Sequence, residues 1–347
     1  LHYPLRRQRQ MCIRDRIGVG LGASWHSRCL ESISFFFNWH LLGKTMGDNA
    51  QRWVVVTDLD GSMLDHHTYS FEAALPALSF LKEEGIPLVL NTSKTRSECK
   101  DLAKKLGLLT PIVVENGGGI SLPIRADAAE PYGPPSMVDY PEDHSIRLGV
   151  SRESIHQVLD EISERRSLCY RSFAQMSIDE LRACTGLEQE AAINAQLRQF
   201  SEPLLWEDTP EALDWFKKRL HSKGLRLIQG GRFHTVSGLH DKGGAVHWIR
   251  SFFASLWHES IHVLALGDGP NDIPMLDAAD RAICVRSPAH PPLVGSRGAY
   301  STSQLEGPSG WNERLCDFLQ KLKTNPSSEE VTFNTASDSL EDLTITA

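Results

Sequence analysis

Two aspartates, Asp58 and Asp60, follow directly after a short apolar segment in the sequence VVVTDLDG. The run of Val54, Val55 and Val56 is typical of a strand that is buried on both faces of a sheet. Such a strand delivers both carboxylates to one point. A carboxylate at a strand end can attack phosphorus and form an aspartyl-phosphate, and a second carboxylate can act as general acid and base. Asp58 is therefore the candidate nucleophile and Asp60 the candidate acid and base.

Three further polar segments are expected to reach the same place. NTSK, with Thr92, follows the next apolar segment, and GDGPND, with Asp268 and Asp272, follows a later one. HDKGG, with Lys242, opens a helix just before the last of these strands. In an open α/β sheet, ligands bind beyond the carboxyl ends of the strands. We expect Thr92 and Lys242 to hold phosphoryl oxygens there.

Several aspartates at one point would repel each other unless a cation lies among them. A hard cation with oxygen ligands, such as Mg²⁺, suits this composition and also binds phosphate oxygens. The predicted metal ligands are Asp58, Asp60, Asp268 and Asp272. Each motif alone has a structural explanation, since D-x-D is a common turn and Thr92 could cap a helix. Their order along alternating strands is what favours catalysis.

These motifs require elements that position them, and the sequence predicts an α/β fold. Apolar strands over 53–58, 86–93, 111–119, 261–269 and 281–287 alternate with amphipathic helices. Continuous Val, Ile and Leu strands separated by helices indicate a parallel, Rossmann-like sheet that is covered on both faces. We assign residues 47–123 and 239–323 to this core.

The middle of the chain, residues 124–238, is expected to form a separate α+β unit inserted into the core. It begins in a segment rich in Pro, Gly and acidic residues and continues with a strand over 145–150. Asp208 and Glu211 fit a capping box for a helix that Gly224 closes. A single strand over 225–237 is expected to follow it.

Composition narrows the partners of the protein. The chain has 347 residues and a net charge of −8, which argues against nucleic acid or an anionic membrane as the main partner. No apolar run reaches the length of a membrane-spanning helix. The seven cysteines are scattered without metal-binding spacing, which favours a reducing, cytoplasmic location. The sequence does not indicate an oligomeric state.

The two ends of the chain differ from the rest. Residues 1–45 are basic, and we interpret them as an organelle-targeting extension or, preferably, as non-native sequence ahead of a start at Met46. Residues 324–347 are acidic and rich in Ser and Thr, which predicts a disordered tail.

The order of motifs resembles the haloacid dehalogenase (HAD) superfamily of phosphatases and phosphotransferases. The segment between Thr92 and Lys242 resembles the cap of its sugar-phosphatase branch. Six segments are, more closely, similar to the mannosyl-3-phosphoglycerate phosphatase family: TDLDGSMLDHHTYSFEAA, LVLNTSKTRSE, IVVENGGGI, TGLEQEAAINAQLRQFSEPLLW, IQGGRFHTVSG and GPSGW. This resemblance implies Mg²⁺-dependent hydrolysis of mannosyl-3-phosphoglycerate to mannosylglycerate, a compatible solute. It also implies Asp58 as nucleophile and Asp58, Asp60 and Asp268 as metal ligands.

A substrate of this kind carries a carboxylate, a phosphate and a sugar, and four residues are candidates to bind it. Arg232 could form two parallel bonds with a carboxylate, while Arg198 and Glu202 could meet the sugar or the glycerate. Asn116 could line the site or only turn the chain. The structural alternatives are a strand-end arginine paired with an acid and a glutamate that caps a turn.

Two other functions stay open from the sequence. The same chemistry could act on glucosyl-3-phosphoglycerate or another sugar phosphate, or could transfer phosphate as a phosphomannomutase does. A non-catalytic ligand-binding protein is the third hypothesis, although no candidate catalytic group is missing.

Overall fold

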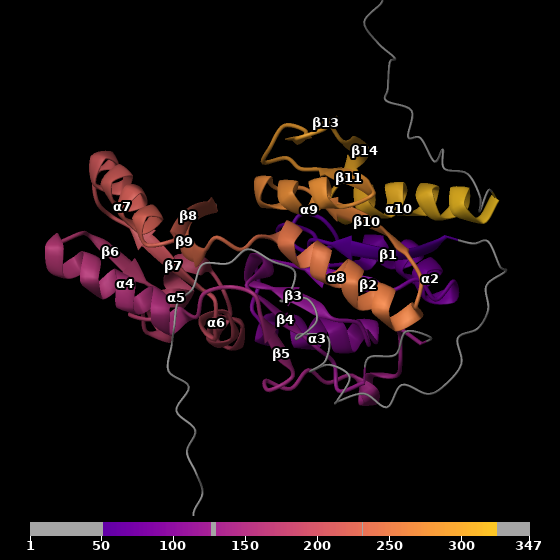
Figure 1. Ribbon diagram of the computed structural model, residues 1–347, viewed down its shortest axis with the longest axis horizontal. Helices are drawn as coiled ribbons and strands as arrows, with labels where there is room; N and C mark the ends of the chain where they lie inside the picture. Colours follow the sequence, from indigo (N-terminus) through magenta and orange to yellow (C-terminus); the bar gives the residue numbers. More distant parts are fainter. Residues whose placement is uncertain (1–50, 126–129, 231, 325–347) are drawn as a thin grey trace, which may run out of the picture. The chain divides into compact units, whose positions relative to one another are not determined.

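The computed structural model describes residues 51–125, 130–230 and 232–324 (Figure 1). The predictions for residues 1–45 and for the tail from residue 325 onward lie outside these ranges. Thr324, where the tail was expected to begin, is the last residue of helix α10.

A large, mostly parallel sheet of eight strands confirms the predicted fold class. Its order is β14-β11-β10-β1-β2-β3-β4-β5, and only the pairs β3–β4 and β4–β5 are antiparallel. The strands are β1 (Arg52–Thr57), β2 (Leu88–Asn91), β3 (Ile112–Val114), β4 (Gly119–Ser121), β5 (Ser145–Arg147), β10 (Ile261–Gly267), β11 (Arg281–Arg286) and β14 (Ser301–Glu306).

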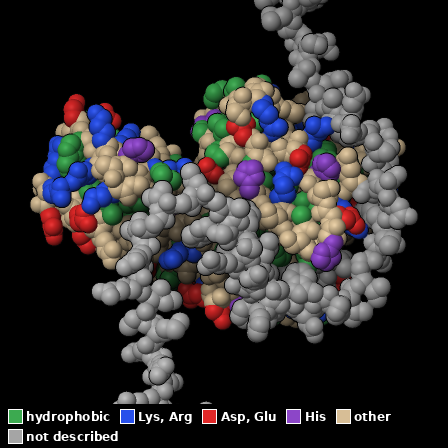
Figure 2. All heavy atoms as spheres, viewed as in Figure 1, with side chains coloured by type: hydrophobic (Ala, Val, Ile, Leu, Met, Phe, Trp, Pro, Cys, Tyr) green, Lys and Arg blue, Asp and Glu red, His purple; other side chains and the backbone are tan. Residues whose placement is uncertain are grey.

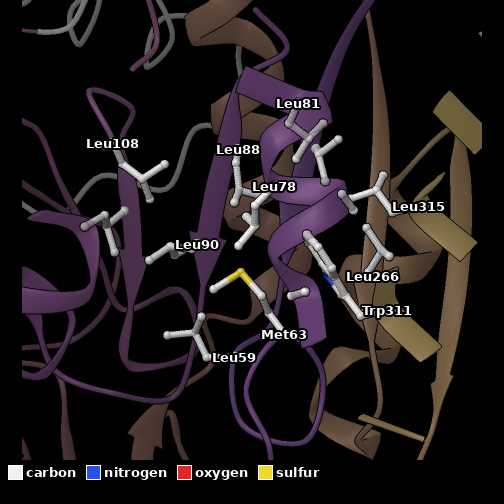
Figure 3. Close-up of a cluster of buried hydrophobic side chains, with 14 of the residues drawn as sticks. Leu59, Met63, Leu78, Leu81, Leu88, Leu90, Leu108, Leu266, Trp311 and Leu315 are labelled. Atoms are coloured by element: carbon white, nitrogen blue, oxygen red, sulfur yellow. The ribbon is translucent and has the colours of Figure 1, made fainter. Parts of the chain in front are cut away.

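Helices cover both faces of this sheet because successive side chains of a strand point to opposite faces. Val55 packs in one apolar cluster with residues of α2 (Leu75–Glu83), α3 (Arg96–Leu106) and α10 (Gly307–Thr324). Figure 3 shows part of this cluster around the indole of Trp311 and the side chains of Leu59 and Met63.

The opposite face is covered by two other helices. Val54 and Val56 pack against buried residues of α8 (Lys242–Trp257) and α9 (Ile273–Ala278). The strand β1 is thus buried on both sides, as its run of valines predicts.

A second sheet of four antiparallel strands has the order β6-β7-β9-β8. Its strands are β6 (Tyr170–Ser172), β7 (Ser201–Trp206), β8 (Leu225–Gly230) and β9 (Phe233–Gly238). Residues of α4 (Arg152–Arg165) and α7 (Pro210–Ser222) pack with Leu204 of β7 on one face. Residues of α5 (Ile178–Thr185) and α6 (Gln189–Gln196) pack on the other face, where Leu205 lies. A short hairpin of β12 (Val294–Gly295) and β13 (Gly298–Ala299) completes the strands described.

Three expectations for the middle of the chain were wrong in detail. The strand β5 pairs with β4 in the large sheet, although we expected it in the inserted unit. The expected single strand over 225–237 is the β8–β9 hairpin, which turns after Gly230. Thr209, not Asp208, caps α7, because the Thr209 hydroxyl accepts the N–H of Ala212 while Asp208 accepts the N–H groups of Cys169 and Thr209.

The described surface carries both signs of charge, and Figure 2 shows acidic and basic side chains interspersed over one face. Within the described ranges, no helix combines the length and apolar character that crossing a membrane requires.

Candidate active site

The carboxyl ends of β1 and β10 bring together aspartates from distant parts of the chain. Thr57 is level with Leu266 in this parallel pair, and the N–H of Asp58 donates to the carbonyl of Leu266 at 2.9 Å. Carboxylate oxygens of Asp58, Asp268 and Asp272 consequently lie within 4.8 Å of one another, and all three residues are buried. The structure therefore gathers three of the four predicted metal ligands.

Lys242 lies within this cluster of aspartates. It is the first residue of α8 and is fully buried, and its Nζ lies 2.6 Å from Asp58 Oδ1 and 2.6 Å from Asp272 Oδ1. Burial alone would lower the pKa of Lys242, but the charges of Asp272 and Asp58 outweigh it and hold the pKa above its usual value. Lys242 is therefore a permanent cation between two carboxylates.

The aspartates nevertheless carry more negative charge than Lys242 can balance. Burial and the charge of Asp58 raise the pKa of Asp268 to about 6 and that of Asp272 to about 7. Three carboxylates with one ammonium group favour an added cation, and their hard oxygen donors fit Mg²⁺. The donor set thus fits the magnesium that the sequence predicts.

Asp272 also has a second role in this site. Its Oδ2 accepts the N–H groups of Asp268 and Gly269, both at 3.0 Å. With Oδ1 bonded to Lys242, this carboxylate holds both the lysine and the loop that carries Asp268.

Asp60 lies apart from the three grouped carboxylates. Its Oδ2 forms an ion pair with Lys94 at 2.9 Å, and Lys94 also stacks over the ring of Tyr69. Burial raises the pKa of Asp60, which Lys94 opposes and Asp58 reinforces, so that the pKa stays above its usual value. This placement does not support the Asp60 carboxylate as a metal ligand, but it suits a general acid. Sequence reasoning missed Lys94 as its partner, although Lys94 stands in the second motif.

The turn after the D-x-D motif is shaped by the loop of Asp268. Gly61 has φ +83°, and a Cβ at this position would lie 2.5 Å from Asp268 Oδ2. Gly61 thus provides both a left-handed turn and room for that carboxylate. The next residue, Ser62, donates from its hydroxyl to Asp268 Oδ1 at 2.9 Å, a contact that the sequence analysis did not predict.

Strand β2 brings Thr92 to the same edge of the sheet as Asp58, because it pairs in parallel with β1. The Thr92 hydroxyl accepts the N–H of Lys94 at 3.2 Å and retains its own proton for donation. The preceding Asn91 donates from its side chain to the carbonyl of Lys242 at 3.1 Å, which ties β2 to the start of α8.

Asn116 is placed beside the loop of Asp268 and Asp272. Its side-chain oxygen accepts a hydrogen bond from the amide of Asn271 at 3.2 Å. Asn116 has φ +57°, a left-handed conformation that turns the chain. Asn116 therefore both turns the chain and lies beside the loop of Asp268 and Asp272.

The structure places the three predicted substrate-binding residues of the four-stranded unit in different environments. Arg198 donates to the carbonyl of Ser93, next to Thr92, and so contacts a loop of the site. Arg232 is exposed and donates to the carbonyl of Cys184. The prediction for Glu202 is not supported, because its fully buried carboxylate is already occupied within this unit.

Glu202 instead forms a closed cluster of charges. It accepts from Arg152 at 2.5 Å, from His156 at 2.6 Å and from the N–H of Ala174 at 3.0 Å. Burial alone would raise its pKa, but these partners outweigh burial and hold the pKa below its usual value. Its role is therefore to hold the unit together.

Comparisons with known proteins identify the relatives of this chain. Residues 55–130 match the family model described as haloacid dehalogenase-like hydrolase. A glucosyl-3-phosphoglycerate/mannosyl-3-phosphoglycerate phosphatase from Methanococcoides burtonii is 33% identical over 271 residues, which cover 77% of this chain and 97% of the relative.

Solved structures share the fold at lower identity. A protein from Thermoplasma acidophilum is 18% identical with a TM-score of 0.53, over 78% of this chain and 98% of that one. A HAD-superfamily phosphatase from Bacteroides thetaiotaomicron is 15% identical with a TM-score of 0.52, over 79% and 97%. The resemblance drawn from the motifs is thus confirmed. The chain belongs to the haloacid dehalogenase-like hydrolases and, within them, to the glucosyl-/mannosyl-3-phosphoglycerate phosphatase family of phosphoric monoester hydrolases.

Proposed function

We propose that this enzyme hydrolyses mannosyl-3-phosphoglycerate to mannosylglycerate and phosphate in a Mg²⁺-dependent reaction. The observation that carries the proposal is the gathering of Asp58, Asp268 and Asp272 around Lys242 at the carboxyl edge of the sheet. The name of the Methanococcoides burtonii relative, which includes the mannosyl and the glucosyl ester, supports the substrate class.

The first step is assigned to Asp58 and Asp60. Lys242 bonds to Oδ1 of Asp58, so we assign the attack on phosphorus to Oδ2. A bond forms between Oδ2 and phosphorus, and the bond from phosphorus to the ester oxygen breaks. Asp60, with its raised pKa, gives its proton to the departing alkoxide, and the sugar-glycerate product is released as the alcohol.

The second step reverses the role of Asp60. Its carboxylate removes a proton from water, the water oxygen attacks the aspartyl-phosphate, and phosphate leaves while the Asp58 carboxylate is regenerated. The ammonium of Lys242 keeps Asp58 oriented in both steps, and the Thr92 hydroxyl donates to a phosphoryl oxygen.

The candidate magnesium ligands are Asp58 and Asp268, supported by Asp272, which holds Lys242 and the loop of Asp268. When bound, Mg²⁺ would neutralise phosphoryl charge and orient the ester. The chain itself contributes the oxygen donors and the hydrogen bond from Ser62 that fixes Asp268.

We also propose that the unit of β6–β9 and α4–α7 acts as a cap that selects the substrate. Arg198, which contacts the loop after β2, is the candidate for binding the glycerate or the sugar, and Arg232 is a second candidate. The described cysteines are free thiols, in keeping with the proposed cytoplasmic location. The proposed product, mannosylglycerate, would give the enzyme a role in compatible-solute biosynthesis.

The second candidate keeps the chemistry but changes the substrate to the glucosyl ester. The relative's name supports this alternative equally, because it includes both sugars. Phosphotransfer to a second sugar has weaker support, because the relative's name is that of a phosphatase. Ligand binding without catalysis also has weaker support, because the candidate nucleophile, acid and cation are all present.

The deciding experiment is phosphate release with and without Mg²⁺. The two sugar phosphoglycerates should be compared with other sugar phosphates and with the Asp58→Asn variant as a blank. We expect Mg²⁺-dependent release from the mannosyl ester. Faster release from the glucosyl ester would establish the second candidate, and no release from any phosphomonoester would refute catalysis.

A further inference from the structure

The segment Glu115–Gly118, between β3 and β4, has an unusual backbone. Glu115, Asn116 and Gly117 have φ values of +50°, +57° and +89°, so three consecutive residues are left-handed. Such conformations are unfavourable for residues other than glycine and persist only where surrounding contacts hold them. The contacts of Glu115 and Asn116 therefore merit a functional explanation.

The side chain of Glu115 reaches into the four-stranded unit. It is only 2% exposed, and its two carboxylate oxygens accept the N–H of Gln199 at 2.8 Å, the N–H of Phe200 at 3.0 Å and the hydroxyl of Ser201 at 2.5 Å. All three donors belong to the segment that leads from α6 into β7. One carboxylate of the large sheet thus fixes the start of a central strand of the other sheet.

The glycines that follow complete a socket for the same segment. A Cβ on Gly118 or Gly119 would overlap the side chain of Phe200. Phe200 is 6% exposed and belongs to the apolar cluster of Val55 and Trp311 on one face of the large sheet. Glu115 therefore binds the backbone of Phe200 by a hydrogen bond, and the two glycines leave room for its side chain.

The backbone of this segment is bonded to the loop of the second motif. The N–H of Glu115 donates to the carbonyl of Lys94, and the N–H of Asn116 donates to the carbonyl of Thr92, each at 2.9 Å. Lys94 is the partner of Asp60. The residue that holds the four-stranded unit thus also touches the loop that carries two groups of the site.

Side-chain hydrogen bonds also connect Glu115 with the loop of Thr92 and Lys94. Ser201, which donates to Glu115, accepts a hydrogen bond from Arg198 at 3.0 Å. Arg198 donates in turn to the carbonyl of Ser93 at 3.2 Å. The chain also enters the four-stranded unit here, because the carbonyl of Gly118 accepts the N–H groups of Leu148 and Gly149.

We infer that Glu115 is a positioning residue that sets the place of the Arg198–Ser201 segment relative to the catalytic loops, and thereby the preference for a large sugar-glycerate ester over small phosphate esters. Its side chain acts through Ser201 and Arg198 and makes no contact with the reacting atoms, whereas the bond from its backbone N–H to Lys94 is kept in a side-chain variant. This inference rests on the proposed function, in which the four-stranded unit selects the substrate.

The test compares two substrates in one set of variants. Glu115→Gln keeps the volume of the side chain, but its amide nitrogen cannot accept an N–H, so a donor in the segment loses its partner. We expect kcat/KM for the preferred sugar phosphoglycerate to fall about 10- to 100-fold. For p-nitrophenyl phosphate, a small ester, it should stay within about threefold of wild type or rise, because the aspartates are untouched.

Ser201→Ala is a milder second variant that removes only one donor. It should lower the ratio of kcat/KM for the preferred sugar phosphoglycerate to kcat/KM for p-nitrophenyl phosphate by about three- to tenfold. Hydrogen exchange should show faster exchange of the Gln199 and Phe200 amides in Glu115→Gln.

Asp280→Asn is a matched control at the opposite, amino-terminal end of the strands. Asp280 accepts the N–H of Val263 at 2.6 Å and a bond from Arg250 at 2.8 Å, so this change also removes charge from a hydrogen-bonded carboxylate. It should affect the two substrates equally.

The outcomes separate the inference from the proposed function. Wild-type selectivity in both Glu115→Gln and Ser201→Ala would overturn the inference, even if the enzyme acts as proposed. If the wild type prefers another sugar phosphate to both phosphoglycerates, the proposed substrate fails. The variants then decide the inference on the ester that the wild type prefers.

Discussion

Two buried clusters, one at the carboxyl edge of the large sheet and one around β7 of the small sheet, combine carboxylates with basic groups in opposite balance. The cluster of the large sheet has three carboxylates, of Asp58, Asp268 and Asp272, around one ammonium group. The cluster of the small sheet has the single carboxylate of Glu202 with a guanidinium and an imidazole. The side chains of Asp272 and Glu202 are both fully buried.

The consequence of this balance is visible in the pKa values. In the first cluster, burial and neighbouring carboxylates raise the pKa of Asp268 and Asp272. In the second, the partners of Glu202 outweigh burial and lower its pKa. A surplus of like charge is unfavourable for folding and persists where function requires it, whereas a balanced cluster can be purely structural. This difference in charge balance explains why the aspartates of the first cluster suit catalysis and Glu202 does not.

The largest test of this contrast is removal of the charge of Asp58. Asp58→Asn should lower kcat for phosphate release by at least about 10³-fold, because the amide is a poor nucleophile. The free energy of unfolding should not fall, since repulsion with Asp268 is relieved and the side-chain oxygen still accepts from Lys242. Urea unfolding and phosphate release measured on one preparation would check both. Unchanged activity would contradict the assignment of the nucleophile.

Removing the cation should destabilise the first cluster. In metal-free buffer, Lys242→Met leaves Asp58 and Asp272 without their partner and should lower the free energy of unfolding by about 3–5 kcal/mol. Adding Asp272→Asn should recover part of this loss, because the two residues are in direct contact. Urea unfolding of the single and double variants measures the coupling. A single variant as stable as wild type would show that Lys242 does not balance the acids.

A divalent ion should stabilise one cluster and not the other. Mg²⁺ at about 100 times its dissociation constant should raise the free energy of unfolding by about 2.7 kcal/mol. Asp268→Asn should reduce this gain and Glu202→Gln should leave it unchanged. Thermal unfolding with a Mg²⁺ titration, and with a chelator as blank, measures the effect. Equal gains in wild type and Asp268→Asn would place the ion elsewhere.

The smallest effect is expected in the balanced cluster. Glu202→Gln should lower the free energy of unfolding by about 1–3 kcal/mol at neutral pH, because buried donors lose a charged acceptor. The native pKa of Glu202 is lowered, so its contribution is present above the usual pKa of glutamate and is lost as pH falls through the native value. The difference in stability between wild type and variant should therefore shrink on acidification. A difference that grows at low pH would refute this account.

The sequence was sufficient to predict the features that follow from local pattern. Runs such as Val54–Val56 predicted the buried strands, and parallel pairing places the carboxyl ends of β1 and β10 together, so Asp58 and Asp268 could be expected to meet. The β8–β9 hairpin had a signal that we missed, since Gly230 and Gly231 interrupt the apolar alternation.

Contacts between distant loops could not be predicted in the same way. The bonds of Glu115 to residues 199–201 depend on how two sheets approach each other, and no local pattern encodes that distance. Glu202 was misinterpreted for the same reason, because its partners Arg152 and His156 come from a helix some 50 residues earlier. Sequence reasoning thus identified candidate reacting groups but not the groups that hold them.

The order of strands in the large sheet has a consequence for biosynthesis. β1 lies between β2 and β10, and Lys242, which pairs with Asp58, is 184 residues further along the chain. A ribosome adds about 5–20 residues per second, so the nascent chain carries β1 with one unpaired, valine-rich edge for roughly ten seconds or more. The cluster of Asp58, Asp268 and Asp272 can form only after residue 272 has been synthesised. Until β10 has been synthesised, one edge of β1 is unpaired and prone to aggregation, so chaperones would need to protect it. In the folded protein this edge is paired with β10.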